Sequence, residues 1–264
     1  MAAPTKRRGV LRGAARAWSE GGAYLLGARA LRRVAEAVQN GADAFAAAGA
    51  ARIVRNARPT TLGEAVDYAA TFGYAGLAIR PMQVRSELQA LLELLSADPP
   101  RAVLEIGTGR GGTLFLFGHV AQRDAVLVSV DAADAEVFGG RRAYKRRARL
   151  YRALGRADQR LVFILGDSHR DETRARVVKA LQGRRLDFLF IDGDHSREGV
   201  EADFRMYSPL VRPGGLVAFH DIVPGPEEEV GGVPDFWQRI RNDAAVELVE
   251  DWGQRGFGIG VLRL

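Results

Sequence analysis

The sequence predicts a doubly wound α/β fold, in which a mostly parallel seven-stranded sheet is preceded by a helical N-terminal region. After Pro100, short apolar runs rich in Val, Ile, Leu and Phe alternate with longer helical patterns. This alternation is typical of a parallel sheet with helical crossovers. The runs are almost continuously apolar, as expected for strands that are buried on both faces. The last two runs have no helical pattern between them, which predicts an antiparallel pair.

The first 80 residues are expected to form a helical arm or lid, and residues 81–264 the main domain. Residues 1–58 carry eleven Lys or Arg against three Asp or Glu, a net charge of +8, which leaves −2 for the rest of the chain. A basic arm can contact nucleic acid, anionic lipid or an acidic subunit, or it can be a solvated face. We favour the solvated face. An Ala-rich helical arm is also suited to packing between subunits of a homo-oligomer.

Several classes of protein are excluded or disfavoured by composition. The chain has no cysteine, which excludes disulfides, thiolate metal sites and cysteine nucleophiles. No apolar stretch is long enough to span a bilayer, so no membrane partner is expected. The basic N-terminus is not followed by the apolar core of a secretory signal. We expect a cytoplasmic protein, with a transit peptide as the alternative.

Two helices are predicted before the sheet. Thr61 followed by Glu64 is a capping box that should begin a short helix, with a Gly- and aromatic-rich loop after it. The segment 81–95 has the apolar spacing of an amphipathic helix, and Asp98, which is followed by two prolines, should end it.

The remaining elements follow in regular alternation. Strands are predicted at 102–107, 125–131, 160–167, 186–192 and 215–221, helices at 112–122, 140–155, 171–182, 197–208 and 234–242, and the antiparallel pair at 245–251 and 257–264.

Polar residues close all five predicted parallel strands. In an open α/β sheet, ligands bind beyond the carboxyl ends of the strands, so these side chains should meet at one edge. They are Glu105 to Gly109, Asp131, Gly166 to Ser168, Asp192 to His195, and His220 with Asp221.

The first of these motifs is EIGTGRGG, residues 105–112. Its glycines let the backbone turn tightly and approach a ligand closely. The order differs from the G-x-G-x-x-G that an NAD-dependent oxidoreductase would carry. Asp131 is placed to accept hydrogen bonds from two ribose hydroxyls, but NAD enzymes use an acidic residue in the same way, so Asp131 alone does not discriminate.

The fourth and fifth motifs belong together. Asp192 and His195 leave one strand end, and His220 and Asp221 leave the next. Two carboxylates and an imidazole converging on one site suit a divalent cation. A histidine, with an ordinary pKa of about 6.5, can also accept a proton at neutral pH.

The motifs together resemble a known family. EIGTGRGG resembles motif I of class I S-adenosylmethionine (SAM)-dependent methyltransferases. With IDGDHSREGVEAD, RPGGLVAFHD and GVPDFWQ, it makes residues 80–262 similar to the small-molecule O-methyltransferases that include cephalosporin-biosynthesis and macrolide-sugar enzymes. The resemblance implies a Rossmann-like methyltransferase fold, SAM as cofactor, a role in natural-product biosynthesis, and a hydroxyl of a sugar or secondary metabolite as acceptor.

The resemblance also implies roles for the strand-end residues. The glycine loop cradles the methionine part of SAM, Asp131 binds the ribose, and the third motif packs on adenine. Asp167 has a second interpretation as the N-cap of the following helix. The implied cofactor-binding residues are Glu105, Gly107, Thr108, Gly109, Gly111, Asp131, Gly166, Asp167, Ser168 and Asp192.

Metal-dependent members of this group bind Mg²⁺ through an Asp at the fourth strand end and an acidic pair at the fifth. A His three residues after the first Asp is their general base. Carried over, Asp192, His220 and Asp221 are the metal ligands, and His195 and Asp192 the catalytic residues. His220 departs from the acidic pair, and imidazole suits Mn²⁺, Fe²⁺ or Zn²⁺ better than Mg²⁺. We predict Mg²⁺ or Mn²⁺; without a metal, the carboxylates would orient substrate hydroxyls.

Two alternatives stay open at this stage. The protein could methylate RNA or another macromolecule and use the basic arm as its grip, or it could bind SAM without catalysis. A basic segment at 141–149 would support the first alternative, but we favour a solvated helix face as its explanation. We expect a small-molecule acceptor and no nucleic-acid partner.

Overall fold

The computed structural model describes residues 41–57, 59–132 and 147–264. Residues 1–45 and 46–264 form two compact units. Of the first unit, residues 41–45 are described and helical; the second unit begins with helical residues 46–56 and contains every element below. The predictions for the N-terminal arm up to residue 40, and for most of the basic segment at 141–149, lie outside the described residues. The domain boundary at residue 80 stays a prediction.

A seven-stranded sheet with the order β5-β4-β3-β6-β7-β9-β8 organises the second unit. Neighbours from β5 through β7 are parallel, whereas β9 runs antiparallel to both β7 and β8. The doubly wound fold and its C-terminal antiparallel pair are therefore confirmed. The strands are β3 (Ala102–Ile106), β4 (Val126–Asp131), β5 (Arg160–Leu165), β6 (Leu186–Ile191), β7 (Val211–His220), β8 (Val246–Leu248) and β9 (Ile259–Arg263).

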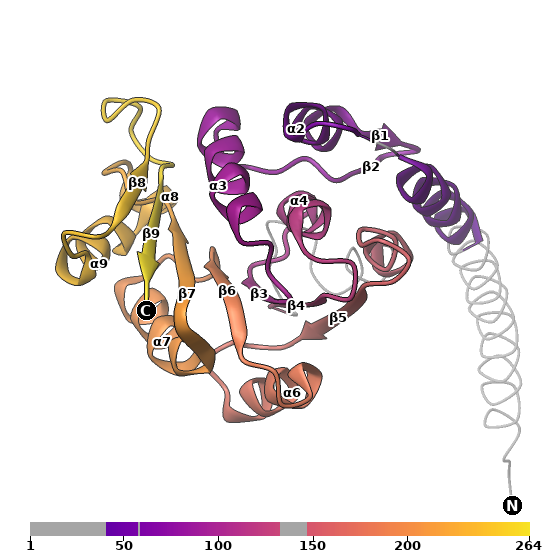
Figure 1. Ribbon diagram of the computed structural model, residues 1–264. Helices are drawn as coiled ribbons and strands as arrows, with labels where there is room; N and C mark the ends of the chain where they lie inside the picture. Colours follow the sequence, from indigo (N-terminus) through magenta and orange to yellow (C-terminus); the bar gives the residue numbers. More distant parts are fainter. Residues whose placement is uncertain (1–40, 58, 133–146) are drawn as a thin grey trace, which may run out of the picture. The chain divides into compact units, whose positions relative to one another are not determined.

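Helices cover both faces of this sheet (Figure 1). Successive residues of β3 show why, because their side chains point to opposite faces of the sheet. Val103 packs into one apolar core and Leu104 into the other. The first core includes α2 (Leu62–Thr71), α3 (Arg85–Ala97) and α4 (Gly112–Val120); the second includes α6 (Asp171–Leu181), α7 (Arg197–Tyr207) and α9 (Val233–Ile240).

The predicted helix boundaries follow from local chemistry. At the start of α2, the hydroxyl of Thr61 accepts a hydrogen bond from the backbone N–H of Glu64 (3.1 Å), and the Glu64 carboxylate accepts one from the N–H of Thr61 (3.3 Å). This confirms the capping box. Helix α3 ends at Ala97 with Asp98 as its C-cap, because Pro99 and Pro100 cannot continue it.

Four features differ from the sequence-based expectation. The loop expected after α2 contains a short hairpin of β1 (Gly73–Tyr74) and β2 (Leu77–Ala78), whose two turn residues both have positive φ. Strand β7 begins before the Pro-Gly-Gly turn rather than after it, because a register shift against β6 absorbs the irregularity. A short helix α8 (Glu227–Val230) and a 3₁₀ turn η2 (Ser208–Leu210) had no sequence signal.

None of the helices among residues 41–57, 59–132 and 147–264 is both long and apolar enough to cross a membrane.

Candidate active site

The predicted site residues share one edge of the sheet. The last paired residue of β3, Ile106, lies beside Val130 of β4 and Ile191 of β6, and Ile191 lies beside Phe219 of β7. The residues that come next along the chain after these four are Gly107, Asp131, Asp192 and His220. The parallel register therefore brings four distant segments of the chain to the same level.

The glycine loop packs directly against the end of β6. Gly107 has a φ of +98°, and a Cβ added there would lie 1.9 Å from the carbonyl oxygen of Asp192. Gly111, the N-cap of α4, has a φ of +82°, and its added Cβ would lie 2.6 Å from Leu154. Only glycine can take these positions without displacing its neighbours. The loop that would cradle the methionine part of SAM thus adjoins Asp192, the first residue of the fourth motif.

Glu105 supports this loop from inside the protein. Its fully buried carboxylate accepts hydrogen bonds from Thr113 of α4 and from Ser129 of β4, the latter at 2.6 Å. When Glu105 is ionised, the Ser129 hydroxyl donates to it, so the Thr108 hydroxyl then donates to Ser129, at 2.6 Å. Burial raises the pKa of Glu105 to about 8 against the effect of these bonds. Direct contact of Glu105 with a cofactor stays a prediction.

The ends of β4 and β5 carry the second and third motifs. Burial raises the pKa of Asp131 to about 6, although Arg147 opposes the shift. The N–H of Gly166 donates to the Asp131 carbonyl at 2.9 Å, which joins the two motifs. Asp167 is exposed and accepts from the N–H of His169 at 2.9 Å, whereas the N-cap of α6 is Arg170. The N-cap interpretation of Asp167 is therefore wrong, and the adenine role stays a prediction.

Helix α7 supports the third motif through residues that the sequence analysis missed. Asp203 is fully buried, and its Oδ1 lies 3.4 Å from Nε2 of His169. Burial raises the pKa of Asp203 to about 6. The Tyr207 hydroxyl donates to the carbonyl of Ser168 at 2.7 Å. A buried aspartate on an amphipathic helix breaks the apolar spacing, and that break was the available signal.

The fourth and fifth motifs form one cluster of two carboxylates and two imidazoles. Nδ1 of His220 lies 3.1 Å from Oδ1 of Asp192 and 3.1 Å from Oδ2 of Asp221. Nε2 of His195 lies 3.6 Å and 3.5 Å from the same two oxygens. The structure therefore brings together all four residues that the sequence placed at these strand ends.

The cluster shifts the pKa values of its members. Burial alone would raise the pKa of Asp192, but the charge of His220 and hydrogen bonds from both histidines outweigh burial and hold the pKa below its ordinary value. The hydrogen bond to Asp192 raises the pKa of His195 to about 9. Burial alone would lower the pKa of His220, but the neighbouring Asp192 raises it to about 10. Opposite charges in the cluster thus stabilise each other.

The backbone of α8 orients His195. Its Nδ1 is hydrogen-bonded to the carbonyl oxygen of Glu229, and a carbonyl can only accept, so Nδ1 carries a proton. The N–H of Gly232 donates to the His195 carbonyl at 2.8 Å. In the neutral ring, Nε2 is therefore the free base, and it faces the two carboxylates.

The cluster also has the donor set of a metal site. Asp192, His195 and Asp221 each offer one ligand atom, and these atoms lie within 4.8 Å of one another. His220 is oriented differently, because its Nδ1 donates to Asp192 and its buried Nε2 has no hydrogen-bond partner among the described residues. Two carboxylates and an imidazole fit Mn²⁺ or Zn²⁺ better than Mg²⁺.

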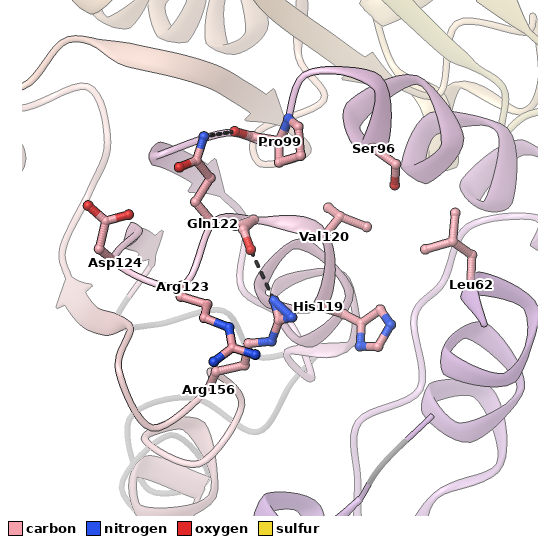
Figure 2. Close-up of a pocket in the computed structure, with 10 residues that line it drawn as sticks. Leu62, Ser96, Pro99, His119, Val120, Gln122, Arg123, Asp124 and Arg156 are labelled. Carbon is pink, nitrogen blue, oxygen red and sulfur yellow. Dashed lines mark hydrogen bonds between the residues drawn. The ribbon is translucent and has the colours of Figure 1, made fainter. Parts of the chain in front are cut away.

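A pocket of about 570 Å³ lies away from this cluster (Figure 2). It is formed near the starts of β3 and β4, whereas the predicted site lies beyond their ends. Arg156 donates to the Ala121 carbonyl at 3.2 Å and Gln122 to the Pro99 carbonyl at 3.1 Å, so these side chains cap local backbone. No residue predicted for the site lines it. Its lining residues are Leu62, Ser96, Pro99, His119, Val120, Ala121, Gln122, Arg123, Asp124 and Arg156.

Residues 104–222 match a family model described as a methyltransferase domain. Every residue predicted for the site, from Glu105 to Asp221, lies within this range.

Solved structures of similar fold include several O-methyltransferases. TomG from Streptomyces achromogenes, solved with SAM, is 19% identical over 78% of this chain and 89% of its own, with a TM-score of 0.49. An O-methyltransferase from Bacillus cereus, solved with SAH, is 20% identical over 78% and 92%, with a TM-score of 0.47. A proposed caffeoyl-CoA O-methyltransferase from Staphylococcus aureus is 18% identical over 69% and 85%, with a TM-score of 0.50.

At these identities the likeness to solved structures is one of fold. The family match identifies a methyltransferase domain. The sheet order, with the glycine loop at the end of β3, shows that this domain has a Rossmann-like arrangement. The chain therefore contains a methyltransferase domain of Rossmann-like arrangement at residues 104–222.

Proposed function

We propose that the protein transfers the methyl group of SAM to a hydroxyl of a small molecule, such as a sugar or a secondary metabolite. The observation that carries the proposal is the position of His195. Its Nε2 lies between the carboxylates of Asp192 and Asp221, and the backbone of Asp192 touches the glycine loop. A proton acceptor thus adjoins the loop expected to hold the methyl donor.

The residues present match what this reaction needs. Bound SAM supplies an electrophilic methyl group on a sulfonium, so the protein must mainly align the acceptor oxygen with it. The acceptor hydroxyl must also lose its proton. Nε2 of His195 can take that proton, because the Glu229 carbonyl holds the other ring proton on Nδ1. The carboxylates of Asp192 and Asp221 stabilise the imidazolium that results.

A divalent cation, Mg²⁺ or Mn²⁺, is proposed at the same cluster. Asp192 and Asp221 would hold it, and such a cation supplies charge that stabilises an alkoxide. Of the two imidazoles, His195 presents its unprotonated ring nitrogen to both carboxylates, whereas the ring nitrogen of His220 that faces them donates to Asp192. If His195 binds the metal, it cannot serve as the base at the same time, so metal dependence and the role of His195 must be tested together.

Methyl transfer from isotope-labelled SAM to a panel of sugars, phenols and RNA tests the proposal. We expect labelling of a small-molecule hydroxyl and none of RNA. The reaction would be run with Mg²⁺, with Mn²⁺ and with EDTA. Labelling of RNA alone would support the macromolecular alternative, and SAM binding without any transfer would support a non-catalytic protein.

The variant His195→Ala tests the base. We expect turnover to fall by roughly 10²- to 10⁴-fold, the usual contribution of a general base, while SAM affinity measured by calorimetry stays near wild type. His119→Ala is the matched control, because His119 lies by the pocket of Figure 2 and away from the cluster. Unchanged turnover in His195→Ala would remove His195 from the mechanism.

A further inference from the structure

Two residues at the start of α3 reach the candidate active site from a distant part of the sequence. Gln83 lies just before the helix and Glu87 in its first turn. The geometry points to both as positioning residues, which fix the orientation of the carboxylates of Asp192 and Asp221. In this orientation one oxygen of each carboxylate faces the two histidines, and we call these two atoms, Oδ1 of Asp192 and Oδ2 of Asp221, the inner oxygens. This inference rests on the proposed function, since it assigns how the catalytic cluster is held.

Gln83 holds Asp192 directly. Its Nε2 donates to Oδ2 of Asp192 at 2.7 Å, while its Oε1 accepts from the N–H of Met82 at 3.1 Å. The side-chain amide is therefore bound at both ends. Because Oδ2 of Asp192 is engaged by Gln83, Oδ1 is the oxygen that faces His195 and His220.

The segment that delivers Gln83 is itself packed on the cofactor side of the site. A Cβ added to Gly112, the first residue of α4, would lie 2.0 Å from the Ile79 carbonyl oxygen and 2.5 Å from the Pro81 nitrogen. Residues 79–81 therefore lie against the helix start that directly follows the glycine loop. The position of Gln83 is set by the same structure that would hold SAM.

Glu87 acts on the other carboxylate through a loop. Its side chain is 2% exposed. Oε1 accepts from the N–H of Glu250 at 3.1 Å and from Nε2 of Gln254 at 2.7 Å, and Oε2 accepts from the N–H of Gly258 at 2.9 Å. A buried carboxylate with three donors fastens the connection between β8 and β9 to α3.

Phe257 passes this restraint to Asp221. It precedes Gly258, and its N–H donates to Oδ1 of Asp221 at 3.0 Å. Its carbonyl accepts from the N–H of Val223 at 3.0 Å, and its ring centroid lies 6.1 Å from that of His220. Phe257 has a φ of +61°, a conformation that a non-glycine residue keeps only when its surroundings hold it there.

The two restraints leave matching atoms free. Gln83 binds the outer oxygen of Asp192, and the N–H of Phe257 binds the outer oxygen of Asp221. The inner oxygens, Oδ1 of Asp192 and Oδ2 of Asp221, both lie 3.1 Å from Nδ1 of His220. Free rotation of either carboxylate would break this pairing, so the start of α3 controls the geometry of the base and of any metal held there.

Gln83→Met and Glu87→Gln test the inference, because they keep side-chain length and remove a donor or part of an acceptor. We expect kcat/KM for the acceptor to fall roughly 10- to 100-fold in Gln83→Met, the effect of losing one hydrogen bond to a charged group, while SAM affinity changes within about twofold. Glu87→Gln should also lower kcat/KM for the acceptor, by a smaller factor, and leave SAM affinity nearly unchanged. Gln89→Met is the control, since the Gln89 side chain donates to the exposed Glu93 on the same helix.

A second measurement does not depend on turnover. The chain has four histidines, so the ring resonances of His195 and His220 can be followed by NMR in the unliganded protein. Gln83→Met and Glu87→Gln should shift both, and Gln89→Met neither. Unmoved rings in the first two variants would overturn the inference, and so would equal losses of SAM affinity and acceptor turnover. If the wild-type protein methylated no hydroxyl, the proposed function would be wrong. The shifts of the His195 and His220 ring resonances would still test this inference.

Discussion

The two halves of the candidate site are held in different ways. The half proposed to bind the cofactor, at the ends of β3 and β4, depends on close backbone packing at Gly107 and on the buried hydroxyl chain from Thr108 through Ser129 to Glu105; we call it the cofactor half. The half proposed to bind the acceptor, at the ends of β6 and β7, depends on charged and polar side chains held by Gln83, Glu87 and the backbone of Glu229 and Phe257; we call it the acceptor half. The first half is held mainly by close backbone packing, and the second mainly by directional hydrogen bonds to side chains.

Gly107→Ala should have the largest effect, because Gly107 is where the halves touch. The new Cβ would lie 1.9 Å from the Asp192 carbonyl oxygen, at a φ of +98°. We expect a loss of unfolding free energy of about 3 kcal/mol or more and no measurable SAM binding. Chemical denaturation and calorimetry measure both.

Gly63→Ala is the control for that substitution. Gly63 lies in α2, and nothing lies within 4 Å of an added Cβ. It should gain about 0.5–1 kcal/mol of stability. Wild-type SAM affinity in Gly107→Ala would show that the loop is less tightly packed than the distances indicate.

The acceptor half should respond to pH through His195. Its pKa of about 9 means that the base form becomes common only as the pH rises, so turnover should increase from pH 7 toward pH 9. The stability contribution runs the other way. The folded protein holds the proton more tightly than the unfolded chain, so stability should fall between the ordinary pKa of about 6.5 and the folded value.

Rate and melting temperature against pH measure both trends. In His195→Ala, this part of the fall in melting temperature should disappear. A wild-type rate that is flat from pH 7 to pH 9 would contradict the assignment of His195 as the base.

The cofactor half should respond to pH through Glu105. Burial raises its folded pKa to about 8, so the folded state binds an extra proton between about pH 4.5 and pH 8 and loses stability as the pH rises through that range. Glu105→Gln removes this dependence. Relative to the variant, wild type should lose on the order of 1 kcal/mol or more of unfolding free energy between pH 5 and pH 8. Parallel stability curves for the two proteins would show that the carboxyl titrates normally.

The smallest effect is expected outside both halves. Thr61→Ala removes the capping box of α2 and should cost about 1 kcal/mol of stability, without changing SAM affinity or turnover. Thermal unfolding and the labelling assay check the two parts separately. A change in turnover would mean that α2 is coupled to the site.

The sequence alone predicted features that depend on neighbouring residues. Apolar runs marked the strands, the capping box marked α2, and a polar residue at each strand end marked the shared edge. Asp131, Asp192 and His220 then lie at the same edge as Gly107, because parallel strands that are neighbours in a sheet end at the same level.

Only the tertiary structure decided which groups hold the cluster of Asp192, His195, His220 and Asp221. Gln83 and its partner Asp192 are 109 positions apart, and Glu87 and Gly258 are 171 positions apart. No local pattern distinguishes a helix-start glutamine that binds a carboxylate from one that faces solvent, as the exposed Gln89 pair on the same helix shows. Hydrogen bonds are short-range and directional, so their partners are specified only after the chain has folded.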